Sequence, residues 1–340
     1  MKKVLLASTV LAMTATVAAA EVTISGNARM GVVYGGNTGN VATGVVNSHS
    51  KLNFSSRVRA EVVMSGETDS GLSFGGAFLI NEAGGAANGS LGSVFVSGAF
   101  GKIEMGDVDG AAEVVTGNLP EIGYTDLDSF NAIGGGASVG ATADENAATA
   151  ALLDNLVGDN EVTYLSDLFN TIGADNPRAT YTYSTGGLTF AASLNDGNVG
   201  LSGAADVKQY SVGVKYAVDA YAVSLGYEVA DIAGAPSAKH LVLGGEATFG
   251  TTTVKAVYGD GSGAIAGFKQ YGLGVTHKMD ALTVKAYYKN TDLGAGADVN
   301  SYGIGAAYDL GGGATLEGGI ADNDIAGTKA VADLGIKFTF

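Results

Sequence analysis

The chain has 340 residues but no cysteine, no tryptophan and only three prolines. Without cysteine, it cannot be a disulfide-based secreted scaffold. Pro120, Pro177 and Pro236 all lie in loop-like segments, as expected if the remaining chain forms strands that hydrogen-bond on both sides. Basic residues are also scarce, with 18 Lys and Arg against 34 Asp and Glu. This balance argues against nucleic acid as a partner, because phosphate binding requires clustered bases.

Long apolar runs are missing too, apart from a short one at the start. Residues 1–20 combine a basic Met1-Lys-Lys segment, an apolar run and an Ala18-Ala-Ala20 end, which is the pattern of a secretory signal peptide. The run is too short and too weakly hydrophobic for a membrane-spanning helix. We therefore predict cleavage before Glu21. Removal of Lys2 and Lys3 leaves 34 acidic against 16 basic residues, a formal charge of about −18.

What the chain does contain is apolar–polar alternation with a period of two, most clearly in residues 331–340. Ten residues is the length that a tilted strand needs to cross a bilayer. An apolar outer face and a polar inner face are typical of transmembrane β-barrels. The outward face comprises Ala332, Leu334, Ile336, Phe338 and Phe340, and the inward face Asp333, Gly335, Lys337 and Thr339.

Sixteen such segments follow one another, and short turns alternate with longer connections. This organisation predicts an all-β fold, a sixteen-stranded antiparallel transmembrane β-barrel over residues 21–340 with a water-filled lumen. Tyr258, Tyr288 and Tyr308 are predicted membrane-interface residues, whereas Tyr287 is predicted to face the lumen. The segments are 22–35, 50–65, 71–83, 91–98, 101–107, 177–185, 187–195, 207–218, 220–229, 239–248, 250–259, 268–278, 280–290, 299–309, 314–321 and 331–340.

One connection, residues 108–176, is unusually long and acidic. No Lys, Arg or His occurs between residues 103 and 177, and a linker of this length is usually functional. By parity, Arg29, Arg57 and Arg59 point into the lumen. If the loop folds inward, its carboxylates face these arginines and create a constriction that filters by size and charge. The alternative is an external acidic loop with the arginines in ordinary lumen salt bridges. Residues 147–157 suggest a short helix and 159–170 a hairpin.

Four blocks resemble the general diffusion porins of alphaproteobacterial outer membranes: 54–59, 97–107, 123–128 and 308–313, together with the Phe-ending strand. The resemblance spans the mature chain and implies a homotrimer whose third long loop folds inward to form the constriction. It also implies that Phe340 belongs to a signal read by the barrel-insertion machinery. The constriction residues that it implies are Arg29, Arg57 and Arg59 on the wall, and Asp107, Asp109, Glu113, Glu121, Asp126 and Asp128 on the loop.

The resemblance also bears on ions. Some members of the family bind calcium among such loop carboxylates, so the resemblance implies a possible calcium site at Asp107, Asp109, Asp126 and Asp128, although no cofactor is expected to be required. Related constrictions often carry a further base on the third strand, whereas the inward positions 73, 75, 77, 79 and 81 hold none here. This departure predicts a shift toward cations.

The expected function is passive diffusion of ions and small hydrophilic solutes across the outer membrane, with a weak preference for cations and no enzymatic step. A substrate-selective porin is the main alternative. A barrel enzyme and a secreted calcium-binding solenoid are weaker ones, because the three histidines are scattered and no nine-residue repeat recurs. His49 and His240 are predicted to lie on the solvated surface, and His277 at the membrane interface. No histidine spacing supports a zinc site.

Overall fold

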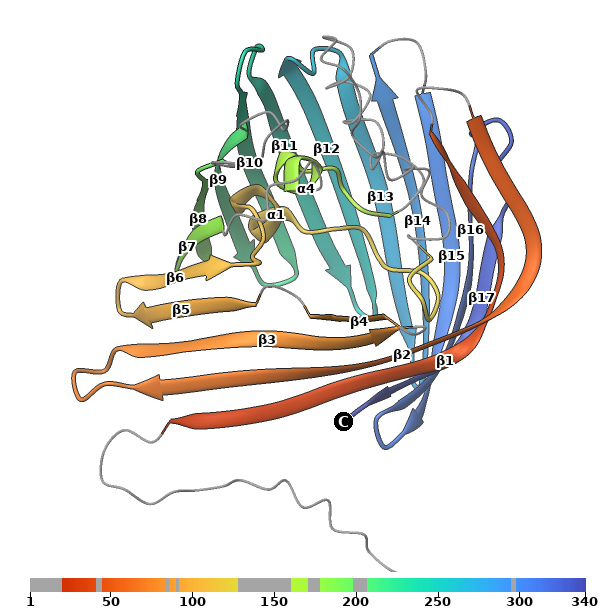
Figure 1. Cartoon of the computed structure of the whole chain (residues 1–340), viewed down its shortest axis with the longest axis horizontal. Coiled ribbons are helices and arrows are strands. Elements are labelled where there is room, and N and C mark those ends of the chain that lie inside the picture. The colour runs from red at the N-terminus through yellow and green to blue at the C-terminus, as the bar shows by residue number, and fades with distance from the viewer. Residues whose placement is uncertain are drawn as a thin grey trace, which may run out of the picture.

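The computed structural model describes residues 20–40, 45–83, 86–89, 92–127, 160–170, 178–197, 207–294 and 298–340 (Figure 1). The predicted signal peptide, apart from Ala20, and the predicted helix at 147–157 lie outside this part of the chain. The strands are β1 (Glu21–Asn40), β2 (Val45–Glu67), β3 (Ser73–Ala83), β4 (Ala86–Gly89), β5 (Ser93–Gly98), β6 (Gly101–Gly106), β7 (Arg178–Thr185), β8 (Leu188–Asn195), β9 (Val207–Val218), β10 (Tyr221–Ile232), β11 (Ala238–Phe249), β12 (Thr252–Gly263), β13 (Phe268–Met279), β14 (Leu282–Leu293), β15 (Asp298–Gly311), β16 (Ala314–Asn323) and β17 (Val331–Thr339).

These strands form one closed antiparallel barrel. Apart from β4 and β5, strands adjacent in the sequence pair with each other, and β17 pairs with β1 from Asn27↔Thr339 to Tyr34↔Ala332. The short β4 pairs with one end of β3 and β5 with the other, so together they fill a single position in the wall. The barrel therefore has sixteen strand positions, as the sequence predicts.

Two predicted connections are shorter than expected. Residues 36–49 were expected to be a loop, but β1 and β2 remain paired as far as Asn40↔Val45. Residues 84–90 were also expected to be a loop, yet they contain β4. Both stretches are rich in Gly, Asn and Ala and lack apolar–polar alternation. A hairpin can continue its backbone ladder without that alternation, so the period-two pattern underestimates the strand length here.

The short turns at one rim have the geometry of two-residue hairpin loops. Asp219 and Asp280 adopt a φ of 49°, and Gly250 a φ of 61°. Tight hairpins of this kind need positive φ, which Asp tolerates better than most residues and Gly adopts freely. These turns lie at the junctions between consecutive predicted segments, and they place one end of each hairpin close to the barrel rim.

The outer surface is apolar, as the alternation predicts. Phe54 is 94% exposed and Leu334 is 54% exposed, whereas the next inward residue, Asp333, is only 7% exposed. Tyr258, Tyr271, Tyr288 and Tyr302 are all exposed and follow one another across four adjacent strands, with Tyr271 and Tyr288 in ring contact at 6.3 Å. Such a row is typical of an interfacial girdle.

Tyr308 and Phe249 are also exposed, near the opposite, short-turn rim. Tyr287 is 6% exposed and faces inward, as predicted. His277 Nδ1 and Thr252 Oγ1 share a 2.8 Å hydrogen bond.

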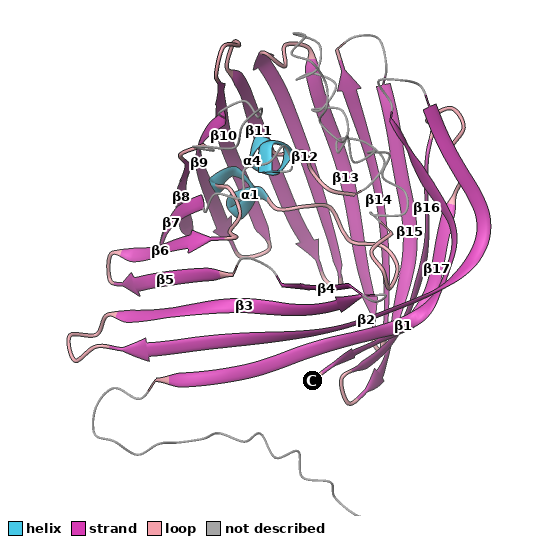
Figure 2. Cartoon of the chain, viewed as in Figure 1, coloured by secondary structure: helices cyan, strands magenta, loops and turns pink. Residues whose placement is uncertain are grey.

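The described parts of the long connection between β6 and β7, residues 107–127 and 160–170, lie inside the barrel. Figure 2 shows their two short helices, α1 (Ala111–Thr116) and α4 (Leu165–Asn170), inside the ring of strands. The hairpin predicted at 159–170 is wrong for the part that forms α4. Within the described residues, no helix is long and apolar enough to span a membrane.

Candidate constriction site

The first limb of the long loop, residues 107–127, is fastened to the wall at its start by α1. The backbone N–H of Ala111 donates to Ser193 Oγ, and that of Ala112 donates to Ser211 Oγ, both at 2.9 Å. Serines on β8 and β9 thus satisfy N–H groups that the first turn of a helix leaves without intrahelical partners. Thr116 shares a further 2.9 Å hydrogen bond with a hydroxyl of β10.

The wall beneath this limb is lined by glycines at points where the loop comes closest. A Cβ atom at Gly226 would lie 2.6 Å from Ala112 Cβ, and one at Gly274 would lie 2.3 Å from Pro120 Cδ. Both distances are too short for non-bonded carbon atoms, so a side chain at either glycine would require the loop or the wall to move. The full set, which we call the glycine track, is Gly213, Gly226, Gly244, Gly272, Gly274, Gly303, Gly305, Gly319, Gly335 and Gly31.

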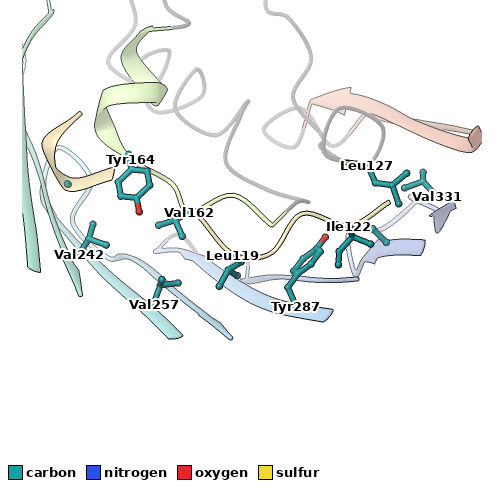
Figure 3. Close-up of a cluster of buried hydrophobic side chains, with 11 residues drawn as sticks. Leu119, Ile122, Leu127, Val162, Tyr164, Val242, Val257, Tyr287 and Val331 are labelled. Carbon is teal, nitrogen blue, oxygen red and sulfur yellow. The ribbon is translucent and has the colours of Figure 1, made fainter. Parts of the chain in front are cut away.

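An apolar seam follows the same path. Leu119, Ile122 and Leu127 of the loop are each at most 2% exposed and pack with wall residues such as Val257 and Tyr287 (Figure 3). Each fully buried aliphatic side chain stabilises the folded state by roughly 1.5–3 kcal/mol. The loop therefore lies on the wall as packed structure rather than as a segment free in the lumen.

The second limb, residues 160–170, is held by a buried polar network. Glu228 accepts hydrogen bonds from the amides of Leu165 at 3.0 Å and Ser166 at 3.4 Å. His240 Nδ1 lies 3.2 Å from Glu228 Oε2, and His240 Nε2 lies 3.2 Å from Gln270 Nε2. A neutral imidazole that donates from Nδ1 and accepts at Nε2 satisfies both contacts.

The same network corrects one prediction. His240 was expected on the solvated surface but is only 1% exposed, because it is an inward residue of β11 beneath the loop. Gln270 completes the attachment by accepting from the Thr163 amide at 2.9 Å and donating to its carbonyl at 2.8 Å. Lys289 donates to the Glu161 carbonyl.

Arg178 joins the two limbs where the loop returns to the wall. Its guanidinium donates to the carbonyl of Val108 in the first limb and to that of Ser166 in the second, the latter at 2.7 Å. Arg178 is 5% exposed, so its charge is balanced by these carbonyls and by the nearby carboxylates of Asp109 and Asp167. A planar guanidinium is suited to bridging several acceptors in this way.

The far end of the first limb is tied to β17. Asp333 accepts from the Thr125 amide at 2.8 Å and from its hydroxyl at 2.6 Å, and its other oxygen accepts from the Gly319 amide at 3.0 Å. Tyr124 lies next to this anchor, and Arg29 donates to its carbonyl at 3.4 Å. The loop thus crosses from β7 to β17 and meets the predicted basic wall.

That basic wall is formed where β17, β1 and β2 meet. Arg29 lies directly opposite Arg57 on one side and Lys337 on the other. Lys337 also forms a 3.0 Å salt bridge with Glu317. Arg57 contacts Asn27 Oδ1 at 3.5 Å, and Arg59 is the register partner of Asn27. The structure therefore brings the three predicted arginines together.

The predicted acidic residues are distributed along the loop. Asp109 and Glu113 lie close to Asp167, which was not among the predicted constriction residues. The pKa of Glu113 is raised to about 9, mainly by burial and secondly by the neighbouring Asp167 carboxylate. Glu121 is exposed to the lumen, Asp126 adopts a φ of 75° near the basic wall, and Asp107 donates its amide to the Gly92 carbonyl. Asp128 lies outside the described residues.

The carboxylates predicted as calcium ligands are not gathered in one place. Thr180 of β7 donates to the Asp109 carbonyl, whereas Asp126 follows Thr125, which is anchored on β17. In the described part of the chain, no group of three or more His, Asp or Glu side chains is arranged to hold a metal ion. Asp128, the fourth predicted ligand, lies outside the described residues, so calcium binding at these carboxylates stays a prediction.

Comparison with known proteins places this architecture in one family. Residues 7–328 match the family model described as Gram-negative porin. The chain is 40% identical to a porin of Rhodobacter capsulatus, over 94% of this chain and the whole of the relative. It is 37% identical, with a TM-score of 0.73, to a porin structure refined at 1.8 Å, again covering 94% of this chain and all of that one.

A triple mutant of the Rhodopseudomonas blastica porin has the same fold at 22% identity, with a TM-score of 0.64 and coverage of 94% and 100%. The closed sixteen-strand barrel agrees with these similarities. The chain belongs to the Gram-negative porin family and is an integral protein of the outer membrane.

Proposed function

We propose that the protein is a passive channel for ions and small hydrophilic solutes, filtered by size and charge at the loop and weakly selective for cations. The observation that carries the proposal is the path of residues 107–127 along the inner wall of the barrel, from Arg178 to Arg29. Acidic side chains of this limb share the lumen with Arg29, Arg57 and Arg59. Opposed charges across water produce a field that orients and selects permeating solutes.

The preference for cations follows from the balance of charge. The chain has a formal net charge of −16, and the inward positions of β3 from Ser73 to Leu79 add no base to the arginine wall. The channel needs no chemical step and no cofactor. Conductance should therefore be the same in EDTA as in calcium. A calcium-dependent change in conductance would indicate that the loop carboxylates bind the metal.

Planar-bilayer recording tests the channel directly. Purified, folded protein should give stepwise currents that are linear in voltage, and a salt gradient should give a reversal potential of the sign expected for cations. Correctly folded protein without channels would contradict the proposal.

Charge reversal tests the filter. The double variant Arg57→Glu/Arg59→Glu should increase the cation-to-anion permeability ratio several-fold, and the Arg57→Gln/Arg59→Gln pair should lie between it and the wild type. An unchanged reversal potential would place these arginines outside the filter.

We also propose that the protein assembles as a homotrimer, contacts lipid through its apolar outer face, and is inserted through its Phe340-containing strand. Conductance steps in groups of three and a trimeric mass in detergent would support the homotrimer. Steps of a single size from a monomeric species would contradict it.

A further inference from the structure

A charged recess lies beside the constriction loop on its short-turn side. Its volume is about 300 Å³, and its lining comes from the loop and from β11 to β14. Glu246 and Lys255 lie on either side of the turn at Gly250, and Lys285 is close to the next turn of this rim. The loop contributes Asn118 and Glu121.

The recess contains two positive and two negative groups, and none of them is neutralised by direct contact. Among the described residues, Glu121, Glu246, Lys255 and Lys285 have no ion-pair partner within 4 Å. Glu246 and Lys255 are nevertheless direct register partners on adjacent strands, so their side chains leave the wall side by side. Both lysines are half-buried and both glutamates are exposed to the lumen.

One of these charges lies next to the loop. A Cβ atom at Gly117, which follows the last residue of α1, would lie 3.1 Å from Lys255 Nζ. The ammonium group therefore lies beside the end of α1, where the loop borders the recess.

We propose that this recess is a binding subsite for zwitterionic solutes, of which α-amino acids are the simplest class; the inference rests on the proposed channel function. The solute carboxylate contacts Lys255 and its ammonium contacts Glu246, while Lys285 and Glu121 surround the remaining side. A simple anion leaves both glutamates without a partner, and a simple cation leaves both lysines without one. Only a solute with both charges matches the balanced lining.

The first experiment titrates L-alanine into symmetric KCl during recording from wild-type channels. We expect a saturable decrease in mean current with added current noise. Propionate and ethylammonium, which each carry one of the two charged groups, should have a much smaller effect at equal concentration. Channels that respond to alanine no more than to these two ions together would overturn the inference but leave the proposed channel function intact. Folded protein that forms no channels would instead contradict that function.

The second experiment assigns the residues. Lys255→Met and Glu246→Gln should each weaken alanine binding about tenfold, because each removes one charge-assisted hydrogen bond. The double variant Lys255→Glu/Glu246→Lys retains both charges and should bind within a few-fold of wild type. Lys278→Met, which removes an exposed lysine of β13 outside the recess, is the matched control. Wild-type affinity in both single variants, or equal losses in the control, would overturn the assignment; conductance without alanine reports that each variant folds.

Discussion

At the scale of single residues, two carboxyl groups control how much negative charge the loop presents to the lumen. Burial is the main cause that raises the pKa of Glu113 to about 9, and Asp167 is the next. Burial inside the barrel also raises the pKa of Asp167, but less, to about 6, because the Arg178 guanidinium opposes the rise. The two carboxyl groups interact, and the proton resides on Glu113, which has the higher pKa. At neutral pH the pair therefore carries one negative charge rather than two.

Cation preference should therefore depend on pH in two steps. As the pH rises through about 6, Asp167 ionises, and through about 9, Glu113 follows, so the cation-to-anion permeability ratio should increase at each step. Reversal potentials between pH 4 and 10 measure this. Glu113→Gln should abolish the upper step only, and a flat wild-type profile would contradict the assignment.

The same proton affects stability. The pKa of Glu113 is raised from 4.5 in its ordinary state to about 9 in the folded protein, so folding favours the protonated form. This contribution is fully present below pH 4.5 and is lost as the pH rises through 9. The attachment of the loop should accordingly weaken in alkaline solution.

A second residue-scale prediction concerns Glu228. Glu228→Ala leaves His240 and the amides of Leu165 and Ser166 without their buried acceptor, which costs about 3 kcal/mol. The amides of Leu165 and Ser166 should then exchange hydrogen about 100-fold faster. Glu317→Ala removes a wall carboxylate that pairs with Lys337 instead of the loop, and should leave that exchange unchanged. Equal protection in both variants would contradict the anchoring role.

Sequence reasoning located the arginine wall but not these anchors. Arg29, Arg57 and Arg59 have the parity of inward residues, and a cluster of like charges is visible in the sequence. Glu228 and His240 also have inward parity, with Ser224 and Val242 respectively, so a signal for their orientation existed. Their partners, however, are backbone amides of the second limb, and the path of a loop without periodicity cannot be derived from a single sequence.

At the scale of elements, alternation identified every barrel strand except the short β4, and it did not identify every strand end. The strands from β9 to β17 match the predicted segments closely, because each alternates from turn to turn. The helices α1 and α4 were missed because six residues span less than two turns, which is too short for a helical period. Both helices are stabilised by contacts with the wall rather than by their own sequence.

The glycine track gives an element-scale prediction. Gly226→Ala places a methyl group where Ala112 now lies, and should push α1 off the wall. Overpacking of this kind typically costs about 1–3 kcal/mol, so the thermal midpoint and the single-channel conductance should both change.

Gly245→Ala is the matched control, since a Cβ there meets no atom within 4 Å. Differential scanning calorimetry and bilayer recording compare the two variants. Identical behaviour would mean that α1 does not depend on close contact with β10.

At the scale of the whole molecule, the excess of acidic residues adds a long-range field to the local filter. Residues 21–340 have 34 acidic against 16 basic residues, a formal charge of about −18 spread over a barrel with few bases. Salt screens such a field, with a Debye length of about 30 Å at 0.01 M and about 3 Å at 1 M. Cation preference should therefore fall several-fold as KCl is raised from 10 mM to 1 M at a fixed gradient ratio. A preference independent of salt would restrict selectivity to residues at the constriction itself.

The glycine track has a consequence for how such a channel changes over generations. Where the loop touches the wall, each loop residue has space because the wall residue opposite it is a glycine, which has no side chain. Gly226 and Ala112 form one such pair, and Gly274 and Pro120 another. A larger residue on one side requires a smaller one on the other, so substitutions at these positions should be inherited as compensating pairs. The width of the opening is then a joint property of two segments far apart in the gene, and neither can be altered safely alone.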